Sequence, residues 1–259
     1  MVYAMPISIR TVAVARGWDW IVESTLLFRK APAIWILLLG TLFLGSRLLL
    51  LVPLLGIGVV LVTPNFVAGL AHGAQALDHG KPLRFGYLVS GFLRNAKPLI
   101  MLGGVSLIAQ MLILLLMVDI GGEAFSNIST VLSGSNPADE ATQQALRDAA
   151  PNALMALLVG LGLSTLLMMA MWFSPLLVFF DDLKPLPALQ LSFRACARNF
   201  LPFLLYGAAA LTPLLVLMPL SVAAGQPDLG LWLIAPLLAP SLYVSYKDIF
   251  QHAPEPIES

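Results

Sequence analysis

Long apolar stretches, separated by short polar segments, dominate this sequence. A helix needs about 20 apolar residues to cross roughly 30 Å of bilayer hydrocarbon. The pattern therefore predicts six transmembrane helices, at residues 33–52, 57–77, 98–118, 153–179, 201–223 and 229–246. The second stretch contains the polar residues Asn65, His72 and Gln75. If the first two stretches formed a single long helix, five spans would remain.

Three shorter segments separate basic from apolar side chains at helical spacing. In residues 187–200, Arg194 and Arg198 lie four positions apart on one face, while apolar residues recur on another. Residues 84–95 and 16–30 show looser versions of the same pattern. Such helices lie in the headgroup plane with their cations toward anionic lipid. We therefore predict three interfacial helices, with ordinary positively charged loops as the alternative.

The same order of features occurs three times along the chain. A basic segment and a proline come first, in residues 28–32, 94–98 and 198–202, and two apolar stretches follow. The second and third basic segments share the pattern Arg-Asn-x-x-Pro, and residues 78–82 and 181–185 share Asp-x-x-Lys-Pro. A repeated order is typical of repeat architectures. The predicted fold is an all-α polytopic membrane protein with six transmembrane helices. They form three repeated hairpins, each preceded by a short amphipathic interfacial helix.

The repeats also set the expected boundaries. We predict one membrane domain between two short tails, with a single external insert in the second repeat. The expected ranges are 1–15 for the N-terminal tail, 16–250 for the membrane domain, about 16–80, 81–182 and 183–250 for the repeats, 119–152 for the periplasmic insert and 251–259 for the C-terminal tail.

The insert has its own local signals. Gly121 and Gly122 predict a flexible start. Asn136 as N-cap and Pro137 at the first helical position predict the start of a helix. That helix is expected to end before Pro151, because the residue before a proline disfavours helical backbone. The insert is therefore predicted to be a small external feature rather than a domain.

Composition places the chain in the membrane class. Hydrophobic residues make up 59% of the chain and charged residues 11%, whereas soluble domains carry about 25% charged residues. Cys196 is the only cysteine, which excludes an intrachain disulfide. Charged residues recur from Arg10 to Lys30 without the apolar segment of a signal peptide. We therefore expect the first span to be an uncleaved anchor.

The positive charges predict the orientation. With six spans and the N-terminus inside, 12 of the 14 Lys and Arg residues fall in cytoplasmic segments. Cations near span ends stay on the cytoplasmic side. We therefore expect a multi-pass protein of the bacterial inner (cytoplasmic) membrane with both termini cytoplasmic. Arg47 is the one cation inside an apolar stretch, and its long side chain is expected to reach the outer interface.

Few residues suggest chemistry. His72 and His79 share a helix face and could bind a metal or relay protons, although polar residues at a helix end explain them better. Asp181 and Asp182 could act as an acid and a base, but their position at a span end resembles that of Asp78 and favours a capping role. The sequence shows no motif of a hydrolase nucleophile, a zinc peptidase or a phosphate-binding loop. We therefore expect no enzyme activity, no cofactor and no metal.

The repeated basic residues form the remaining candidate site. They are Arg29, Lys30, Arg94, Lys97, Arg194 and Arg198. Cations at one headgroup depth attract anionic lipid such as phosphatidylglycerol or cardiolipin, by about 1 kcal/mol each. For Arg94 and Arg198, inward bonds to carbonyls or to the aspartate pair between repeats are an equal alternative, because an asparagine follows each of them. We favour lipid contact for the other four.

Three groups of residues resemble a known family. They are the segment Arg16-Gly17-Trp18-x-Trp20-Ile21, the Arg-Asn-x-x-Pro repeats and the Tyr-rich segment 241–250. Over roughly residues 10–250 the chain resembles a family of uncharacterised six-span inner-membrane proteins from proteobacteria. It is also distantly similar to the membrane domains attached to some glycerophosphodiester phosphodiesterases. The resemblance implies a location and an architecture, and it supplies no active-site residues.

These observations favour a non-enzymatic inner-membrane protein with a structural, envelope-homeostasis or partner-binding role. Its expected partners are membrane lipids and an unidentified membrane protein, and no nucleic acid. A small transporter or channel subunit is the alternative, suggested by prolines in the even-numbered spans and by Asn65, Gln110 and Tyr243. A third hypothesis is a lipid-modifying enzyme that uses the aspartate pair or His72.

Overall fold

The computed structural model describes residues 7–134 and 140–251. They divide into two compact units. We call the first the main unit, which lies within Met1–Gly103 and Met169–Ser259, and the second the paired-helix unit, Gly104–Met168. The helix start predicted at Asn136 and Pro137 lies outside the described residues.

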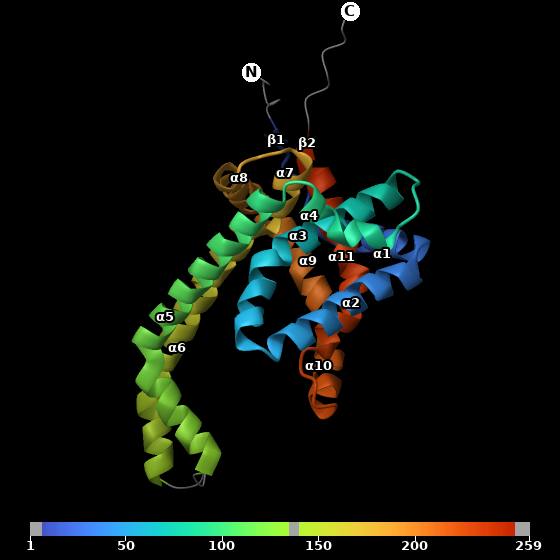
Figure 1. Cartoon of the computed structure of the whole chain (residues 1–259). Coiled ribbons are helices and arrows are strands. Elements are labelled where there is room, and N and C mark those ends of the chain that lie inside the picture. The colour runs from blue at the N-terminus through green and yellow to red at the C-terminus, as the bar shows by residue number, and fades with distance from the viewer. Residues whose placement is uncertain (1–6, 135–139, 252–259) are drawn as a thin grey trace, which may run out of the picture. The chain divides into compact units, whose positions relative to one another are not determined.

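Helices make up nearly all of the described chain, which confirms an all-α fold (Figure 1). In chain order the elements are β1 (Ser8–Ile9), α1 (Arg16–Lys30), α2 (Pro32–Leu50), α3 (Pro53–Asp78), the 3-10 helix η1 (Phe85–Val89), α4 (Ser90–Leu93), α5 (Ala96–Gly134), α6 (Glu140–Trp172), α7 (Ser174–Phe180), α8 (Pro185–Arg198), α9 (Phe200–Leu211), α10 (Leu214–Ala223), α11 (Leu229–Ile249) and β2 (Phe250–Gln251).

Prolines mark the start of several helices. Pro32, Pro53 and Pro185 occupy the first turn of α2, α3 and α8. Proline suits this position because its missing N–H would have no partner there and its φ is already helical. Leu51 and Val52 separate α2 from α3. The first two apolar stretches therefore form two helices and not one.

Within residues 7–134 and 140–251, five helical segments are long and apolar enough to cross a membrane. They are Pro32–Leu50, Leu55–Asp78, Ala96–Gly122, Arg147–Phe180 and Leu229–Ile249. The number rises to six if α9 and α10, which are bent by 43° at the break between them, form one span. The break includes Pro213, which cannot donate a helical hydrogen bond. Together with the exposed leucines described below, these helices identify an integral membrane protein.

Two of the three predicted interfacial segments are regular helices, α1 and α8. The middle one, residues 84–95, differs from the prediction, because it forms η1 and the four-residue α4. Gly91 in α4 lies so close to α3 that a Cβ atom there would overlap the backbone of Asn65. Likewise, a Cβ on Gly69 of α3 would come within 2.6 Å of the Leu88 carbonyl oxygen. Residues 84–95 therefore pack with their backbone directly against α3 and do not form the expected surface helix.

The beginning and the end of the main unit are joined by a short antiparallel pair of strands. Ser8 lies opposite Gln251, and Ile9 lies opposite Phe250. The Arg10 N–H extends the pairing by donating to the Ile249 carbonyl at 2.8 Å. Part of the segment that we assigned to an N-terminal tail is therefore packed into the fold.

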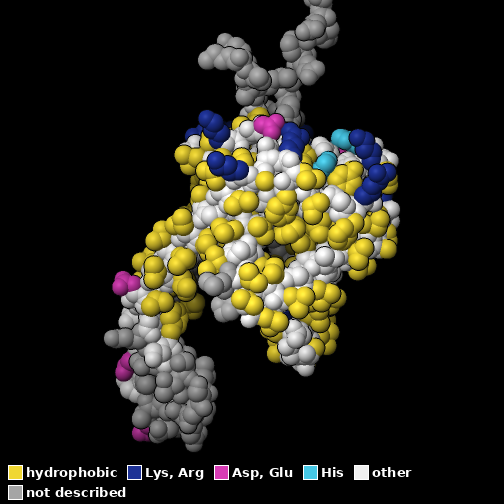
Figure 2. Space-filling model, viewed as in Figure 1, with side chains coloured by type: hydrophobic (Ala, Val, Ile, Leu, Met, Phe, Trp, Pro, Cys, Tyr) yellow, Lys and Arg dark blue, Asp and Glu magenta, His cyan; other side chains and the backbone are white. Residues whose placement is uncertain are grey.

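The core of the main unit is rich in aromatic residues, whereas its outer surface is rich in leucine. Trp20, Trp35 and Phe173 are fully buried, and the Phe173 and Phe250 rings meet edge to face at 5.2 Å. Leu48 and Leu215 remain 67% and 77% exposed. Figure 2 shows that such apolar side chains form a broad surface on this unit. A soluble monomer rarely exposes so much apolar area, so this surface suits lipid.

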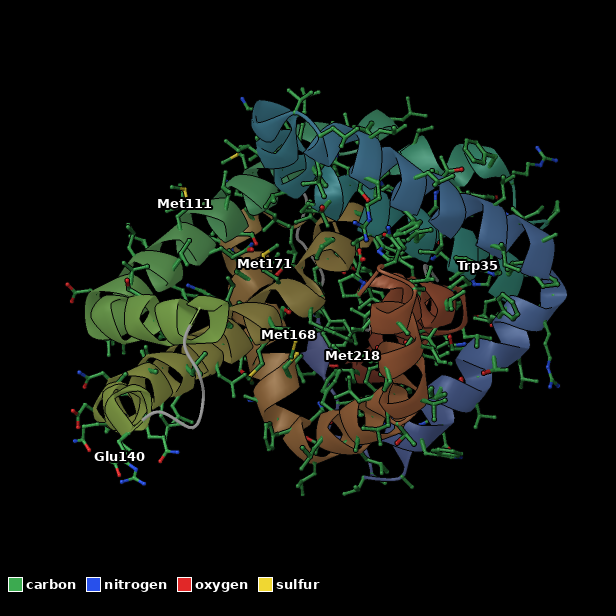
Figure 3. The ribbon with its side chains drawn as sticks, turned by 90° about the horizontal axis from the view of Figure 1, so that it is seen from below. Trp35, Met111, Glu140, Met168, Met171 and Met218 are labelled. Carbon is green, nitrogen blue, oxygen red and sulfur yellow. The ribbon has the colours of Figure 1, made fainter. Side chains whose placement is uncertain are left out.

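The paired-helix unit consists of parts of α5 and α6, which lie side by side (Figures 1 and 3). Small residues bring the two helices together. A Cβ added to Gly121 would come within 2.8 Å of the Ala156 Cβ, and one added to Gly160 would overlap the Met117 side chain. The contact between the helices is therefore apolar and close.

The predicted insert, residues 119–152, differs from our expectation within the described residues. Gly121 and Gly122 lie inside α5 and do not start a flexible segment. On the other helix, α6 continues through Pro151. A proline removes one helical hydrogen bond, but buried Ala149 and Ala153 pack on either side of it against α5. This packing keeps the helix continuous.

Candidate functional site

Four aspartates lie where long helices of the main unit end. Asp78 is the last residue of α3, Asp181 and Asp182 follow α7, and Asp248 lies in the last turn of α11. We call these four residues the carboxylate cluster. A carboxylate at a helix C-terminus faces the negative end of the helix dipole, so each needs a compensating donor or cation.

The helix α11 supplies partners to two of the other helix ends. Tyr243 Oη donates to Asp78 Oδ2 at 3.1 Å, and Lys247 Nζ lies 2.9 Å from the same oxygen. One turn along, Tyr246 Oη donates to Asp181 Oδ2 at 2.5 Å. Because Tyr243 and Tyr246 are almost fully buried, these bonds hold α3 and α7 to one central helix.

Asp248 of α11 joins that helix to α1. Its Oδ2 accepts from Arg16 Nε at 2.7 Å and from the buried Trp20 Nε1 at 3.0 Å. Arg16 also pairs with Glu23 at 3.0 Å. Partial burial lowers the Arg16 pKa, but the hydrogen bonds and charges of Asp248 and Glu23 outweigh it and raise the pKa above its usual value. The guanidinium therefore stays charged.

Asp182 pairs with the second basic segment. Asn95 Nδ2 donates to Asp182 Oδ1 at 2.7 Å, and Arg94 Nη2 donates to Oδ2 at 3.0 Å. The Asn95 amide also bonds the Val178 carbonyl at 2.7 Å. The hydrogen bond from Asn95 is the largest effect and lowers the Asp182 pKa; partial desolvation opposes it, and the charge and hydrogen bond of Arg94 lower the pKa further. For Arg94, the structure therefore shows the inward bond between segments.

Asn199, in the third basic segment, has a different partner. It is fully buried. Its Oδ1 accepts from the Val12 N–H at 2.9 Å, and its Nδ2 donates to the Arg10 carbonyl at 3.0 Å. The asparagine therefore holds the N-terminal segment, while Arg198 beside it makes no ion pair or hydrogen bond with the described residues. The two Arg-Asn-x-x-Pro segments also differ in backbone, with φ of 58° at Asn95 and −115° at Asn199.

The other four basic candidates also fall into two groups, those that bond a protein group and those that do not. Lys30 Nζ donates to the Leu77 carbonyl, at the end of α3, at 3.2 Å. Arg29, Lys97 and Arg194, like Arg198, have no ion pair or hydrogen bond within the described residues. In Figure 2, Lys and Arg side chains gather over one end of the main unit, above the apolar surface.

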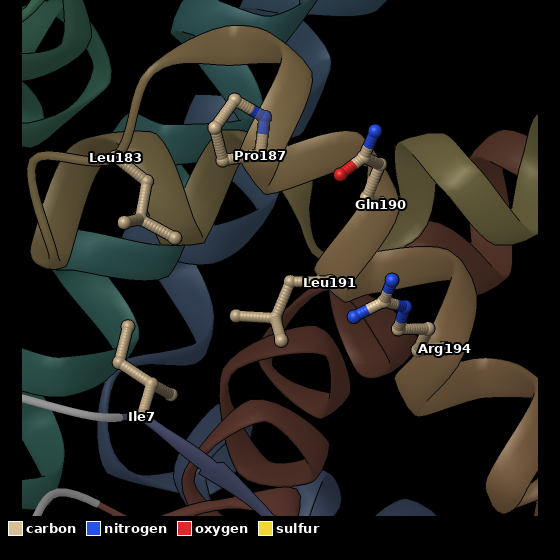
Figure 4. A pocket seen from close by; sticks show the side chains of 6 residues that line it. All are labelled: Ile7, Leu183, Pro187, Gln190, Leu191 and Arg194. Carbon is tan, nitrogen blue, oxygen red and sulfur yellow. The ribbon is translucent and has the colours of Figure 1, made fainter.

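Arg194 borders a shallow hollow on α8 (Figure 4). Arg194 and Gln190 form its polar side, and the rest of the lining is apolar. Its apolar residues are Ile7, Leu183, Pro187 and Leu191. A second hollow lies where Lys30 and Pro32 face Leu77 and Leu83. Each combines one cation with apolar walls.

His72 does not gather with other ligands. Its ring packs against Tyr87 at 4.8 Å and Phe179 at 5.2 Å, and its buried Nδ1 has no partner among the described residues. No group of three His, Cys, Asp or Glu side chains in the described ranges could hold a metal ion.

A polar pair lies at the far ends of α2 and α11. Arg47 bonds Asp228, and its guanidinium also lies 5.3 Å from the Phe43 ring centre. Asp228 immediately precedes α11, whose other end carries Asp248. Twenty residues of helix separate these two aspartates, which corresponds to about 30 Å. The two polar layers are thus one hydrocarbon thickness apart.

Each interfacial segment is joined to another helix by one small polar residue. Ser24 of α1 donates to the Leu237 carbonyl of α11 at 2.5 Å. Asn65 of α3 donates to the Gly91 carbonyl of α4 at 3.0 Å. Ser192 of α8 accepts from the Phe173 N–H at the break between α6 and α7 and donates to the Met169 carbonyl of α6. Sequence reasoning missed these three contacts, because a lone serine or asparagine gives no pattern.

Tyr246 and Trp20 were not predicted as functional, and Tyr243 was named only as a polar residue that suggests transport. The sequence did contain a signal for the two tyrosines. Tyr243, Tyr246 and Asp248 all lie in the segment 241–250, on which the family resemblance partly rests. The spacing of three residues places Tyr243 and Tyr246 on one side of α11, and Asp248, two residues further, lies on another face. Which carboxylate each one binds depends on the packing of distant helices.

Comparison with known proteins agrees with the membrane architecture. The chain is 27% identical, over 92% of its length and 92% of the relative's, to a curated protein of Burkholderia thailandensis described as a probable inner membrane protein. No protein-family model matches the chain. No solved structure matches it either. The relative's description and the apolar helices together support a multi-pass inner-membrane location.

Proposed function

We propose that this inner-membrane protein has a non-enzymatic role, in which a rigid basic end binds anionic lipid and supports a membrane partner. One observation carries the proposal. The carboxylates at the helix ends are bonded within the main unit, whereas Arg29, Lys97, Arg194 and Arg198 have no protein partner among the described residues. The aspartates thus stabilise the fold, whereas these four cations are available to bind an anion outside the protein.

The bonding of the acids also argues against the enzyme hypothesis. A general acid or base must reach a substrate and exchange a proton with it. Asp78 instead faces Lys247 and Tyr243, and Asp248 faces Arg16 and Trp20. Charge-assisted bonds of this kind hold a carboxylate in a fixed position. These groups are suited to joining helices.

We further propose six spans, three hairpin repeats and cytoplasmic termini. The 30 Å between Asp228 and Asp248 supports α11 as a full span, and the Arg47–Asp228 pair supports an outer interface at that level. The three similar contacts of Ser24, Asn65 and Ser192 support the repeats. Single cysteines replacing His79 and Gln226 should label from opposite sides of an intact inner membrane. Labelling from one side would contradict both the topology and the repeats.

Lipid binding can be measured directly on the full chain. The variant carries Arg29→Gln, Lys97→Gln, Arg194→Gln and Arg198→Gln. Each cation near an anionic surface contributes about 1 kcal/mol, so cardiolipin should raise the Tm of the wild type and raise that of the variant much less. Tm in neutral detergent should be similar for both, since these side chains bond no protein group in the described chain.

The matched control is Arg147→Gln, which removes a cation predicted to lie on the opposite side of the membrane. It should keep the full response to cardiolipin. An equal response from the fourfold variant would refute lipid binding by these residues. A large loss of Tm in neutral detergent would instead assign them to the fold.

A transport role is the second candidate, and one observation favours it. Asn65 Oδ1 and His72 Nδ1 are buried in α3 without a partner among the described residues. Polar atoms inside a span often mark a pathway. Proton flux into proteoliposomes, followed with a pH-sensitive dye, should then fall in Asn65→Leu. Equal flux in empty vesicles and in protein-containing vesicles would remove this candidate. The distant similarity to domains of glycerophosphodiester phosphodiesterases stays a prediction.

A further inference from the structure

Gln110 is a polar residue in the middle of an apolar span. Between Pro98 and Val118 of the span Ala96–Gly122, the only other polar side chain is that of Ser106. At 1.5 Å per residue, Gln110 lies about 21 Å from one end of the span and about 18 Å from the other. It is therefore at the depth where neither water nor lipid headgroups can reach it.

The amide of Gln110 is only half satisfied. Its Nε2 donates to Ser106, at 2.8 Å to the hydroxyl and 3.2 Å to the carbonyl, on the preceding turn of α5. Its Oε1 accepts no hydrogen bond from the described residues. The side chain is exposed rather than packed between α5 and α6. Acyl chains offer no donor, so this oxygen requires one from a protein.

The surroundings of Gln110 are suitable for a helix contact. Met111, Leu114 and Val118 on the same helix are 54–60% exposed. In Figure 3, Met111 points outward from α5. An exposed apolar surface with an amide at its edge is suited to helix association in membranes, where an interhelical hydrogen bond supplies specificity.

We propose that Gln110 pairs two copies of this chain through α5. A carboxamide is self-complementary: Oε1 of each copy accepts from Nε2–H of the other, while the remaining N–H stays with Ser106. Such a reciprocal contact closes around a twofold axis, as is usual for homodimers. A different protein would need a donor at the same depth, whereas a second copy always supplies one.

The dimer can be tested with the full chain in proteoliposomes. Donor- and acceptor-labelled copies should show energy transfer that depends on the protein-to-lipid ratio. Gln110→Leu should weaken the association roughly 5- to 30-fold, the range that one interhelical amide bond supplies. Gln110→Asn keeps the carboxamide and should recover part of the loss. Thr165→Val is the matched control, because Thr165 bonds the Leu161 carbonyl of its own helix.

Cysteine cross-linking tests the geometry independently, in a Cys196→Ala background. Leu114 lies one turn from Gln110 on the same face, whereas Leu112 lies on another face with nearly equal exposure, 60% against 61%. Leu114→Cys should cross-link between chains, and Leu112→Cys should not. A monomeric wild type, or a dimer unchanged by Gln110→Leu, would overturn the proposal. Lower Tm in Gln110→Leu with unchanged association would place the partner in the same chain and overturn it too.

Discussion

The main unit and the paired-helix unit are stabilised in different ways. In the main unit, polar side chains join residues far apart in sequence, such as Arg16 with Asp248 and Asn199 with Val12. In the paired-helix unit, the hydrogen bonds of Gln110, Gln144 and Thr165 close within four residues of one helix. There the two helices meet through Gly121 and Gly160.

This difference follows from the number of neighbours that each helix has within its own unit. In the main unit a helix is packed against several others, and every polar group buried between them needs a hydrogen-bond partner. Within the paired-helix unit the two helices share one interface, and close van der Waals packing at small residues is enough for it. We therefore expect the main unit to tolerate substitution poorly and the paired-helix unit to tolerate it well.

The largest expected difference comes from one substitution made in each unit. A Cβ at Gly17 of α1 would overlap the backbone carbonyl oxygen of Pro202, whereas one at Gly160 would overlap only the end of the Met117 side chain. Backbone cannot yield without moving α9, so Gly17→Ala should cost about 1–3 kcal/mol or more. Met117 can rotate, and alanine favours helix by up to about 1 kcal/mol over glycine.

Thermal unfolding in the same detergent measures both effects. Gly17→Ala should lower Tm clearly, and Gly160→Ala should leave it unchanged or raise it. Equal losses in the two variants would show that the units are equally intolerant, which contradicts the comparison.

A smaller difference should follow from removing one polar side chain in each unit. Asn199→Ala would leave the Val12 N–H and the Arg10 carbonyl without these bonds. The Val12 N–H is buried, and one buried unsatisfied group costs about 1–3 kcal/mol. Thr165→Val loses only a bond within its own helix and should change stability by less than about 0.5 kcal/mol. Proteolysis of the N-terminal segment, together with Tm, distinguishes the two, since only Asn199→Ala should expose residues near Val12.

The smallest expected effect is a pH dependence that belongs to the main unit. The pKa of Asp182 is lower in the folded chain than in the unfolded chain, because of Asn95 and Arg94. Its contribution to stability is therefore complete above the unfolded pKa of about 4 and is lost as the pH falls through the folded value. Asp182 is 65% exposed, so the effect should be small. Asp182→Asn should flatten the fall of Tm below about pH 4, and an unchanged slope would mean that other carboxylates cause it.

Some site features were visible in the sequence, and others were not. The two Asp-x-x-Lys-Pro segments correctly indicated that Asp78 and Asp181 lie at helix ends. A helix end can be predicted from neighbouring residues alone, without knowledge of the tertiary structure. Arg94 was left between lipid and protein, because its partner Asp182 lies 88 residues away in sequence. The two Arg-Asn-x-x-Pro segments looked equivalent, yet Asn95 has positive φ and Asn199 does not. A shared motif therefore did not imply a shared conformation.

The sequence by itself determined that this is an α-helical membrane protein and where most of its helices lie. Apolar length and helical periodicity are local properties, and the bilayer imposes the same limit on every span. Tertiary structure decided the rest. Residues 84–95 pack on α3 as a 3-10 helix and a single α-helical turn. The helix α6 continues through Pro151, and the chain bends between α9 and α10. Tertiary structure also chose which tyrosine meets which aspartate, because that depends on the approach of helices that the chain brings together only on folding.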